Sequence, residues 1–359
     1  MKFSPRVTEF TQDKLLPKVV DIVNNSNVFT ARVTANPKNW MGEVMKQPIQ
    51  VANSSTGGPF SGMDTFDTSA TDNVRSLKWY VKAHNQTITI PGIEKDVNAV
   101  NDTQVISLIG AKMDEAANSL IDSLGTAFYG KGVGDSIEGL GLIVDNGTAT
   151  SSYGDISRAE LPSINASVTA AAGGTLSLAL VSAAFDDASA AGDAHESPTI
   201  AYTTKAVWSL FETILNSKLT VQYEALRAGG YNKVTNSTPN GVSVPGSALK
   251  GAAGFDSIDY RGKQVVADDK APAGTFFWVN ENYLEFRRLL SKQLKQIPSK
   301  NQVTEGAYAS SPQPSFLQMR DFLSPVNQYG EIGVLIVMGN LIHRNPRRNS
   351  KITGITKAA

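Results

Sequence analysis

Hydrophobic and polar positions alternate along SLKWYVKAHNQTITIP, residues 76–91. Leu77, Trp79 and Val81 fall on one face of an extended chain, so this stretch predicts one long strand with two different faces. The stretch before it, VANSSTGGPFSGMDTFDTSATDNV, is rich in Gly, Ser, Thr, Asp and Asn and offers little that would bury a strand. Residues 43–91 therefore predict an extended β-hairpin with an oversized tip, whose proline-containing first strand lies at a sheet edge.

Apolar residues recur at steps of three and four after Asn101 or Asp102, either of which can cap a helix. The pattern predicts one continuous helix over residues 102–129, roughly 40 Å long at 1.5 Å per residue and well above the average length. Four of its residues are expected to face a terminal sheet: Leu108, Met113, Leu120 and Leu124. Glycines in YGKGVGDSIEGLGLI end the helix, and GLGLIVDNGT then predicts a strand that enters a turn at Asn146-Gly147.

Three further helices are predicted over residues 175–191, 203–217 and 281–296, each with one apolar face. Those faces are Val181, Ala184, Phe185 and Ala188; Val207, Leu210, Phe211, Ile214 and Leu215; and Tyr283, Phe286, Leu289, Leu290 and Leu294. Short strands are expected at TIAYTT, DYRGKQVVAD and GTFFWVN, which makes this region a mixed α+β domain. SFLQMRDFL and EIGVLIVMGNLIHRN predict a final pair of strands.

Two segments are predicted to lie outside the compact parts. Residues 1–42 indicate an extended arm with a short helix after Pro17, and residues 236–254 indicate a surface loop rich in Gly, Pro and Ser.

The net charge of +0 provides no overall field that would attract nucleic acid or an anionic membrane. The absence of cysteine excludes disulfides, thiolate zinc sites and cysteine nucleophiles, and neither a standard signal peptide nor a membrane span is apparent.

No motif predicts catalysis, a cofactor or a metal. The glycines after Tyr129 close a helix, whereas a dinucleotide-binding loop follows a strand and opens one. The three histidines share no ligand spacing, and no serine-hydrolase motif is present; the histidines are His84, His195 and His343. Two acidic pairs, Asp186-Asp187 and Asp268-Asp269, lack a calcium-loop pattern and are predicted to be solvated surface.

The segment HRNPRRNSKITGITKAA is basic, since no acidic residue follows Glu331. Arg344, Arg347 and Arg348 are candidates for contacting packaged DNA or a neighbouring subunit, and a merely solvated tail is the alternative. No aromatic residues are interleaved there to support base stacking.

The order of these pieces, namely arm, long hairpin, long helix, mixed α+β domain and returning strand, resembles the major capsid proteins of tailed bacteriophages with the HK-97 type fold. The phrases GLGLIVDNGT, AELPSINASV, DDKAPAGTFFWVNENYL and MGNLIHRNPRR are similar to those of phage coat proteins. The resemblance implies an α+β capsid fold with an N-arm at 1–42, an E-loop hairpin at 43–91, a P-domain at 92–197 containing the spine helix, an A-domain at 198–310, and a return to the P-domain with terminal strands and a basic tail at 311–359.

The resemblance also implies a structural protein, not an enzyme, that self-assembles into the icosahedral head shell of a virion in the host cytoplasm. Expected partners are further copies in pentamers and hexamers, a portal, decoration proteins and packaged double-stranded DNA, with no membrane and no cofactor. Because the arm starts at residue 1, a scaffolding protein is expected to be separate. Some relatives form lysine–asparagine cross-links, but no residue matches that motif position by position.

The long hairpin is expected to be covered by a neighbouring subunit, because unpaired strand edges promote aggregation. Residues expected to contact a neighbouring subunit are Lys78, Trp79, Val81 and Lys82.

Two other functions remain open on the sequence: an encapsulin-like compartment that packages an enzyme, and an enzyme with its site under the loop at 236–254. The lack of a convergent histidine, carboxylate or nucleophile cluster argues against the enzyme.

Overall fold

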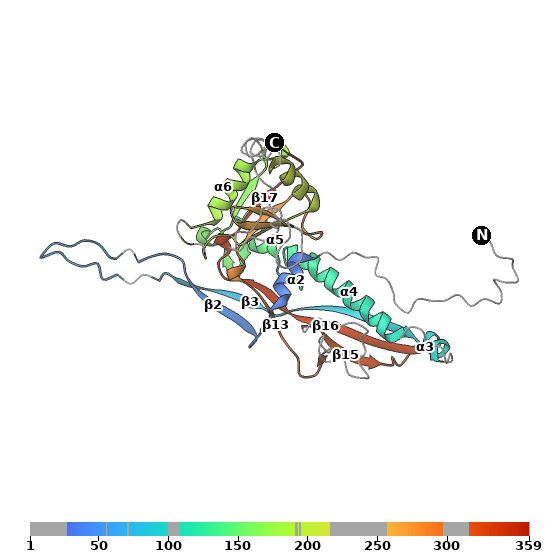
Figure 1. The fold of residues 1–359 in the computed structure, drawn as a ribbon. Coiled ribbons are helices and arrows are strands. Elements are labelled where there is room, and N and C mark those ends of the chain that lie inside the picture. Colours follow the sequence, from blue (N-terminus) through green and yellow to red (C-terminus); the bar gives the residue numbers. More distant parts are fainter. Residues whose placement is uncertain are drawn as a thin grey trace, which may run out of the picture. The chain divides into compact units, whose positions relative to one another are not determined.

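The computed structural model describes residues 27–54, 56–69, 72–99, 108–190, 193, 195–215, 257–296 and 316–358 of the 359-residue chain (Figure 1). The chain divides into two compact units. The described part of unit 1 lies within residues 85–121 and 290–337, and the described part of unit 2 within 27–84, 122–289 and 338–358. The predicted arm helix after Pro17 and the predicted loop at 236–254 lie outside the described residues, and the predicted domain boundaries stay predictions.

Helix α4 (Leu108–Tyr129) is the predicted spine helix, and it contributes residues to both units. It ends at Tyr129 before the glycines, as predicted, whereas residues 102–107 lie outside the described part of the chain. Met113, Leu120 and Leu124 are fully buried, which confirms that the three-to-four-residue period marks the packed face.

Unit 1 contains the predicted final pair of strands. β15 (Gln318–Leu323) is antiparallel to the first part of β16 (Gly330–His343), and β14 (Lys295–Gln296) extends the pair on the other side of β15. The turn between β15 and β16 contacts α3 (Gly92–Ala99) at its first residue. The N–H of Gly92 donates to the carbonyl of Tyr329 at 3.0 Å, and a Cβ at Gly92 would lie 2.4 Å from the Tyr329 ring, so a side chain does not fit there.

Unit 2 is built on a six-stranded sheet in the order β10-β11-β9-β12-β17-β7. The strands are β7 (Ser167–Ala170), β9 (Ile200–Thr203), β10 (Ser257–Tyr260), β11 (Lys263–Ala267), β12 (Phe276–Val279) and β17 (Ser350–Thr353). β10 and β11 form a hairpin whose two turn residues, Arg261 and Gly262, both have positive φ, where DYRGKQVVAD predicted a single strand.

Helices cover both faces of this sheet. On one face Phe185 of α6 (Leu178–Ala188) contacts Trp278, and Phe211 of the helix at 205–215 contacts Phe276. All four apolar positions predicted for α6 are buried, although the helix begins at Leu178 and not at 175, and the side chain of Ser177 caps it. The opposite face is covered by α2 (Val28–Ala35), a helix that the sequence patterns did not predict, and by the end of α4.

The predicted helix at 281–296 is wrong. Asn280 does cap a turn there, since its side chain accepts a hydrogen bond from the N–H of Asn282, but the turn ends at Tyr283. The chain continues as strand β13 (Leu284–Arg288), antiparallel to the second part of β16 and parallel to β1 (Lys38–Asn39). Pairing with two strands that are distant in the sequence outweighs the helical spacing of the apolar residues.

Two smaller predictions also need correction. GLGLIVDNGT does not enter its turn as a strand, because Leu140–Ile143 form the short helix α5. Asp268 is not a solvated surface residue: it is 1% exposed and accepts hydrogen bonds from the N–H groups of Phe29 and Lys270, both at 2.8 Å. Asp268 thereby caps α2, whose own N-cap residue Asn27 forms no capping bond.

Candidate functional site

The predicted hairpin is present in unit 2. β2 (Val44–Gln50) pairs antiparallel with β3 (Val74–Tyr80) over its whole length, and these two strands form a sheet of their own. The long two-faced strand predicted for 76–91 is divided, however, because β3 ends at Tyr80 and β4 (Lys82–Pro91) starts after Val81. The buried positions are Leu77 and Trp79 before this break and Ile88 and Ile90 after it, so the buried face changes from odd to even residues.

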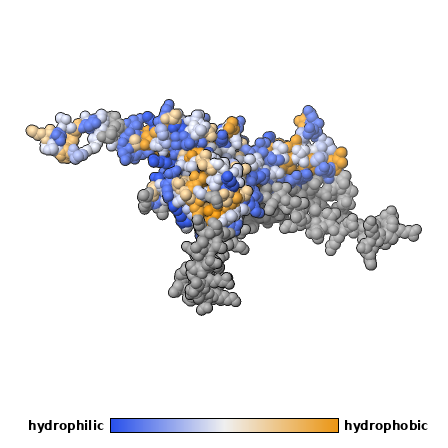
Figure 2. Space-filling view, turned by 90° about the horizontal axis from the view of Figure 1, so that it is seen from above, coloured by the Kyte–Doolittle hydropathy of each residue, from blue (hydrophilic) through white to orange (hydrophobic). Residues whose placement is uncertain are grey.

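The hairpin tip, residues 51–73, carries a cluster of exposed apolar side chains. Phe60 is 67% exposed, Met63 100% and Phe66 68%, and the two phenyl rings lie edge to face with centroids 5.2 Å apart. Figure 2 shows hydrophobic atoms, in orange, at the far end of the hairpin. The sequence patterns missed this cluster, although three large apolar residues spaced by three in a Gly/Ser/Thr-rich stretch are a detectable signal.

Acidic residues of the same tip accept hydrogen bonds from neighbouring serines. The carboxylate of Asp64 accepts a hydrogen bond from the N–H of Ser61 at 2.7 Å, and the carboxylate of Asp67 accepts from the N–H and hydroxyl of Ser69. The hydrogen bonds from Ser69 lower the pKa of Asp67. The tip contains no lysine or arginine, so it presents apolar and negatively charged groups together.

The base of the hairpin belongs to the core of unit 2, which corrects the expectation for Trp79. Trp79 is 0% exposed and its ring packs against that of Tyr153, so its side chain is not free to contact another subunit. Leu77 packs on the turn between β5 (Ser152–Tyr153) and β6 (Ile156–Ser157), where a Cβ on Gly154 would lie 2.7 Å from Cδ2 of Leu77. Gly154 adopts a φ of 57° in this turn, a conformation that glycine favours.

The other predicted hairpin contacts lie closer to the surface. Lys78 and Val81 are partly exposed, and the Lys82 ammonium donates to the carbonyl of Gly134 at 2.6 Å. Near Lys82, Glu138 donates its backbone N–H to Oδ1 of Asn340 at 3.0 Å. Burial raises the pKa of the Glu138 carboxyl to about 7, against the opposing effects of Asn340 and Lys82. The role of Lys78, Val81 and Lys82 in contacts between subunits stays a prediction.

The basic segment after His343 is part of the fold and not a solvated tail. Residues 350–353 form β17 inside the six-stranded sheet, and Lys351 is only 9% exposed. Arg344 donates to Glu285 at 2.5 Å, where Lys38 and Arg287 also contact the same carboxylate. Burial alone would raise the pKa of Glu285, but the hydrogen bond from Lys38 and the charges of Arg344 and Arg287 hold it below its usual value.

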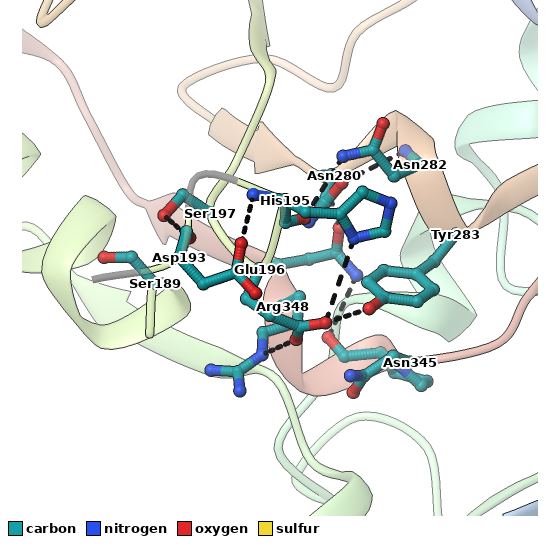
Figure 3. A network of polar contacts seen from close by, with 12 residues as sticks. Ser189, Asp193, His195, Glu196, Ser197, Asn280, Asn282, Tyr283, Asn345 and Arg348 are labelled. Atoms are coloured by element: carbon teal, nitrogen blue, oxygen red, sulfur yellow. Dashed lines mark hydrogen bonds and ion pairs between the residues drawn. The ribbon is translucent and has the colours of Figure 1, made fainter. Parts of the chain in front are cut away.

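Arg348 is engaged in a polar network (Figure 3). Its Nε donates to Glu196 at 2.7 Å, and the hydroxyl of Tyr283 donates to the other oxygen of that carboxylate. Burial and the hydrogen bond to Glu196 raise the pKa of Tyr283 to about 12. Arg347 is exposed instead. Of the three predicted arginines, therefore, Arg344 and Arg348 are held by carboxylates, and Arg347 is the one directed to the surface.

Two of the histidines form hydrogen bonds within the described parts of the chain. His343 is fully buried between the carbonyl of Asn280 and the side chain of Asn349, and burial lowers its pKa to about 3. His84 contacts the hydroxyl of Ser123. Among the described residues, no group of three His, Cys, Asp or Glu is arranged to hold a metal ion, and none of the helices is long and apolar enough to cross a membrane.

No protein-family model and no curated protein matches the chain. Solved structures do match over nearly the whole length. The capsid of cyanophage A-1(L) is 16% identical, with a TM-score of 0.66 and 98% of each chain covered. The capsid of Myoviridae phage XM1 is 11% identical, with a TM-score of 0.54 and 99% of each chain covered.

The chain has the HK-97 type capsid fold. The SrpI encapsulin from Synechococcus elongatus is also similar, at 9% identity and a TM-score of 0.59, over 100% of this chain and 98% of that one. Within the HK-97 type fold, the sequence-predicted order of hairpin, long helix, mixed α+β region and returning strand is found in the described residues. The candidate site is the exposed hairpin tip, where Phe60, Met63 and Phe66 are at least 67% exposed.

Proposed function

We propose that the chain is a major capsid protein that assembles into an icosahedral shell enclosing a phage genome. The observation that carries the proposal is the exposed tip cluster of Phe60, Met63 and Phe66 on a subunit with the HK-97 type capsid fold. Large exposed apolar side chains grouped on a soluble surface mark interaction sites. A contact made by each tip is repeated at every subunit, so individually weak contacts give a stable shell.

The proposal includes the expected partners. Copies of the chain form pentamers and hexamers, a separate scaffolding protein and a portal take part in assembly, and decoration proteins bind the outside of the virion. Packaged double-stranded DNA contacts the inner surface without sequence specificity, and Arg347 is the exposed candidate for a phosphate contact. Assembly takes place in the host cytoplasm. Enzymatic activity is not expected.

Negative-stain electron microscopy of the purified full-length protein tests the proposal. We expect hollow shells or capsomer rings, with or without a co-expressed scaffolding protein. Compact monomers under both conditions at tens of micromolar would contradict it. The contents of the shells separate the two kinds of shell protein: a phage capsid is expected to hold DNA after packaging, whereas an encapsulin-like compartment is expected to co-purify with a defined protein cargo.

A second variant tests the role of the hairpin. Replacing residues 55–70 with a short Gly-Ser link removes the exposed cluster, and none of the described residues 56–69 within it is buried. Circular dichroism and the melting temperature are expected to stay close to wild type, while light scattering no longer detects shells. Shells that form normally with the shortened hairpin would show that the tip is a surface loop without a role in assembly.

A further inference from the structure

A groove of about 620 Å³ lies beside α2 and β13 in unit 2. Its lining contains three cationic and two acidic side chains: Arg32, Lys38 and Arg344, and Glu281 and Glu285. Arg287 adds a fourth cation, because its guanidinium contacts the carboxylate of Glu285 at 2.9 Å. The groove therefore concentrates positive charge in a chain whose overall net charge is +0.

The two carboxylates do not neutralise these cations. Glu281 accepts hydrogen bonds from Nε and Nη2 of Arg32 at 3.0 and 2.6 Å, so it is paired with one arginine. Glu285 is shared by three cations, since Lys38 contacts it at 2.7 Å and Arg344 at 2.5 Å in addition to Arg287. One carboxylate carries a single negative charge, so positive charge remains at this end of the groove.

The cations around Glu285 are accessible to a ligand. The side chain of Lys38 is 56% exposed and that of Arg344 is 38% exposed. An ammonium has three N–H donors and a guanidinium has five, and the contacts with Glu285 use only some of them. An incoming anion can therefore accept hydrogen bonds here without displacing Glu285.

The groove has the chemistry of a phosphate-binding surface. Arginine presents a planar fork of donors that matches phosphate oxygens, and lysine supplies a compact positive charge beside it. One aromatic side chain belongs to the described lining, that of Phe286, and it is only 1% exposed. A nucleic acid in the groove would consequently be bound through its backbone and not through stacked bases.

We propose that this groove binds the phosphate backbone of the packaged double-stranded DNA. The inference rests on the proposed function and names a surface for the DNA contact that is separate from the exposed Arg347. Binding through phosphates alone is independent of sequence and weakens as the salt concentration rises. The same groove is present on every subunit, so contacts that are individually weak add up along a packaged genome.

Lys38→Gln tests the groove, because it removes one exposed cation while Arg287 and Arg344 still contact Glu285. Binding of a fluorescently labelled duplex of about 20 base pairs to unassembled full-length protein is measured by anisotropy at several salt concentrations. The variant is expected to bind several-fold more weakly than wild type. The slope of log affinity against log salt concentration is expected to become shallower by about 0.9 for one lost phosphate contact.

Lys205→Gln is the matched control, since it makes the same change of charge at an exposed position on the helix at 205–215. It is expected to bind the duplex like wild type. Acetylation of lysines, followed by peptide mass spectrometry, locates the DNA on the wild-type protein. We expect the duplex to slow acetylation of Lys38 and to leave acetylation of Lys205 unchanged.

Several results would overturn the groove as a DNA site: no binding of wild type at low salt, equal loss of affinity in Lys38→Gln and Lys205→Gln, or acetylation of Lys38 that is unaffected by the duplex. Displacement of the duplex by a few millimolar inorganic phosphate at constant ionic strength would also overturn it, by showing that the groove takes a free phosphate ion. Each of these results leaves the shell function intact if electron microscopy shows shells. If wild-type protein forms no shells or rings, the proposed function itself is wrong, and the role of the groove in packaging is wrong with it.

Discussion

The indole ring of Trp79 lies edge-on to the phenol ring of Tyr153, with centroids 6.2 Å apart. Trp79 belongs to the hairpin, whereas Tyr153 belongs to the small β5-β6 hairpin that follows α5, and both side chains are at most 1% exposed. The base of the hairpin is consequently fixed within its own subunit at Trp79, whereas the tip remains exposed.

The first prediction concerns this contact. Trp79→Ala leaves a large cavity and is expected to lower the free energy of unfolding by about 3–5 kcal/mol, measured by urea denaturation of the unassembled subunit. Val74→Ala is the matched control, since Val74 lies on the same strand but is 55% exposed; it is expected to change stability by less than about 0.5 kcal/mol. A Trp79→Ala subunit that unfolds like wild type but fails to form shells would show that Trp79 contacts a neighbouring subunit.

The second prediction concerns the long helix. Leu120 is 0% exposed, so Leu120→Asp buries a carboxylate without a partner and is expected to cost several kcal/mol. The variant should yield no soluble protein. Ser119→Asp introduces the same charge at the adjacent exposed position and is expected to remain soluble with a melting temperature close to wild type. Solubility and melting of Leu120→Asp equal to those of the control would show that this face of α4 is not packed.

The third prediction is a pH dependence. Folded Glu138 keeps its proton up to about pH 7, against an ordinary carboxyl pKa of 4.5 in the unfolded chain. As the pH rises from 4.5 to 7, the unfolded chain loses this proton while the folded protein still holds it. The contribution of Glu138 to the free energy of unfolding therefore falls over this range. At 1.36 kcal/mol per pKa unit, the loss is at most about 3 kcal/mol.

Glu138→Gln removes this dependence. The free energy of unfolding of the variant and of wild type is measured at pH 5 and at pH 8. The variant is expected to be more stable relative to wild type at pH 8 than at pH 5. Glu160→Gln, at an exposed position, is expected to show no such change between the two pH values. A constant difference between wild type and Glu138→Gln at both pH values would mean that Glu138 is ionised in the folded protein throughout.

The fourth prediction separates two adjacent arginines. Arg348→Gln breaks the ion pair with Glu196 and is expected to lower the free energy of unfolding by about 1–3 kcal/mol. Arg347→Gln is expected to leave stability within about 0.5 kcal/mol of wild type and to reduce the DNA retained by filled shells. Normal DNA content with Arg347→Gln would remove Arg347 from the proposed DNA contacts.

Long periodic segments were predictable from sequence. The period of α4 and the continuous apolar run of β16 identify both elements, because each pattern is long enough to outweigh local ambiguity. Residues 284–288 were not predictable in the same way. Their apolar spacing fits a helix, and they form a strand because β16 and β1 supply backbone partners that a local pattern cannot reveal.

The candidate site was predictable only in part. Alternation along the hairpin predicts two faces, but which face is buried depends on Tyr153 and Gly154, which lie far along the sequence. Similarly, a run of basic residues cannot show that Glu285 and Glu196 bind Arg344 and Arg348. The exposure of Phe60, Met63 and Phe66 is likewise a property of the folded chain, which a local pattern does not reveal.

The position of β17 has a consequence for how the subunit is made. β17 lies between β12 and β7 and is the strand that joins β7 to the rest of the sheet, yet the ribosome synthesises it after all the other strands of that sheet. A nascent chain that has not reached Ser350 leaves the edges of β12 and β7 unpaired. Translation must therefore pass residue 353 before this sheet can close, and prematurely terminated chains lack the strand that completes it.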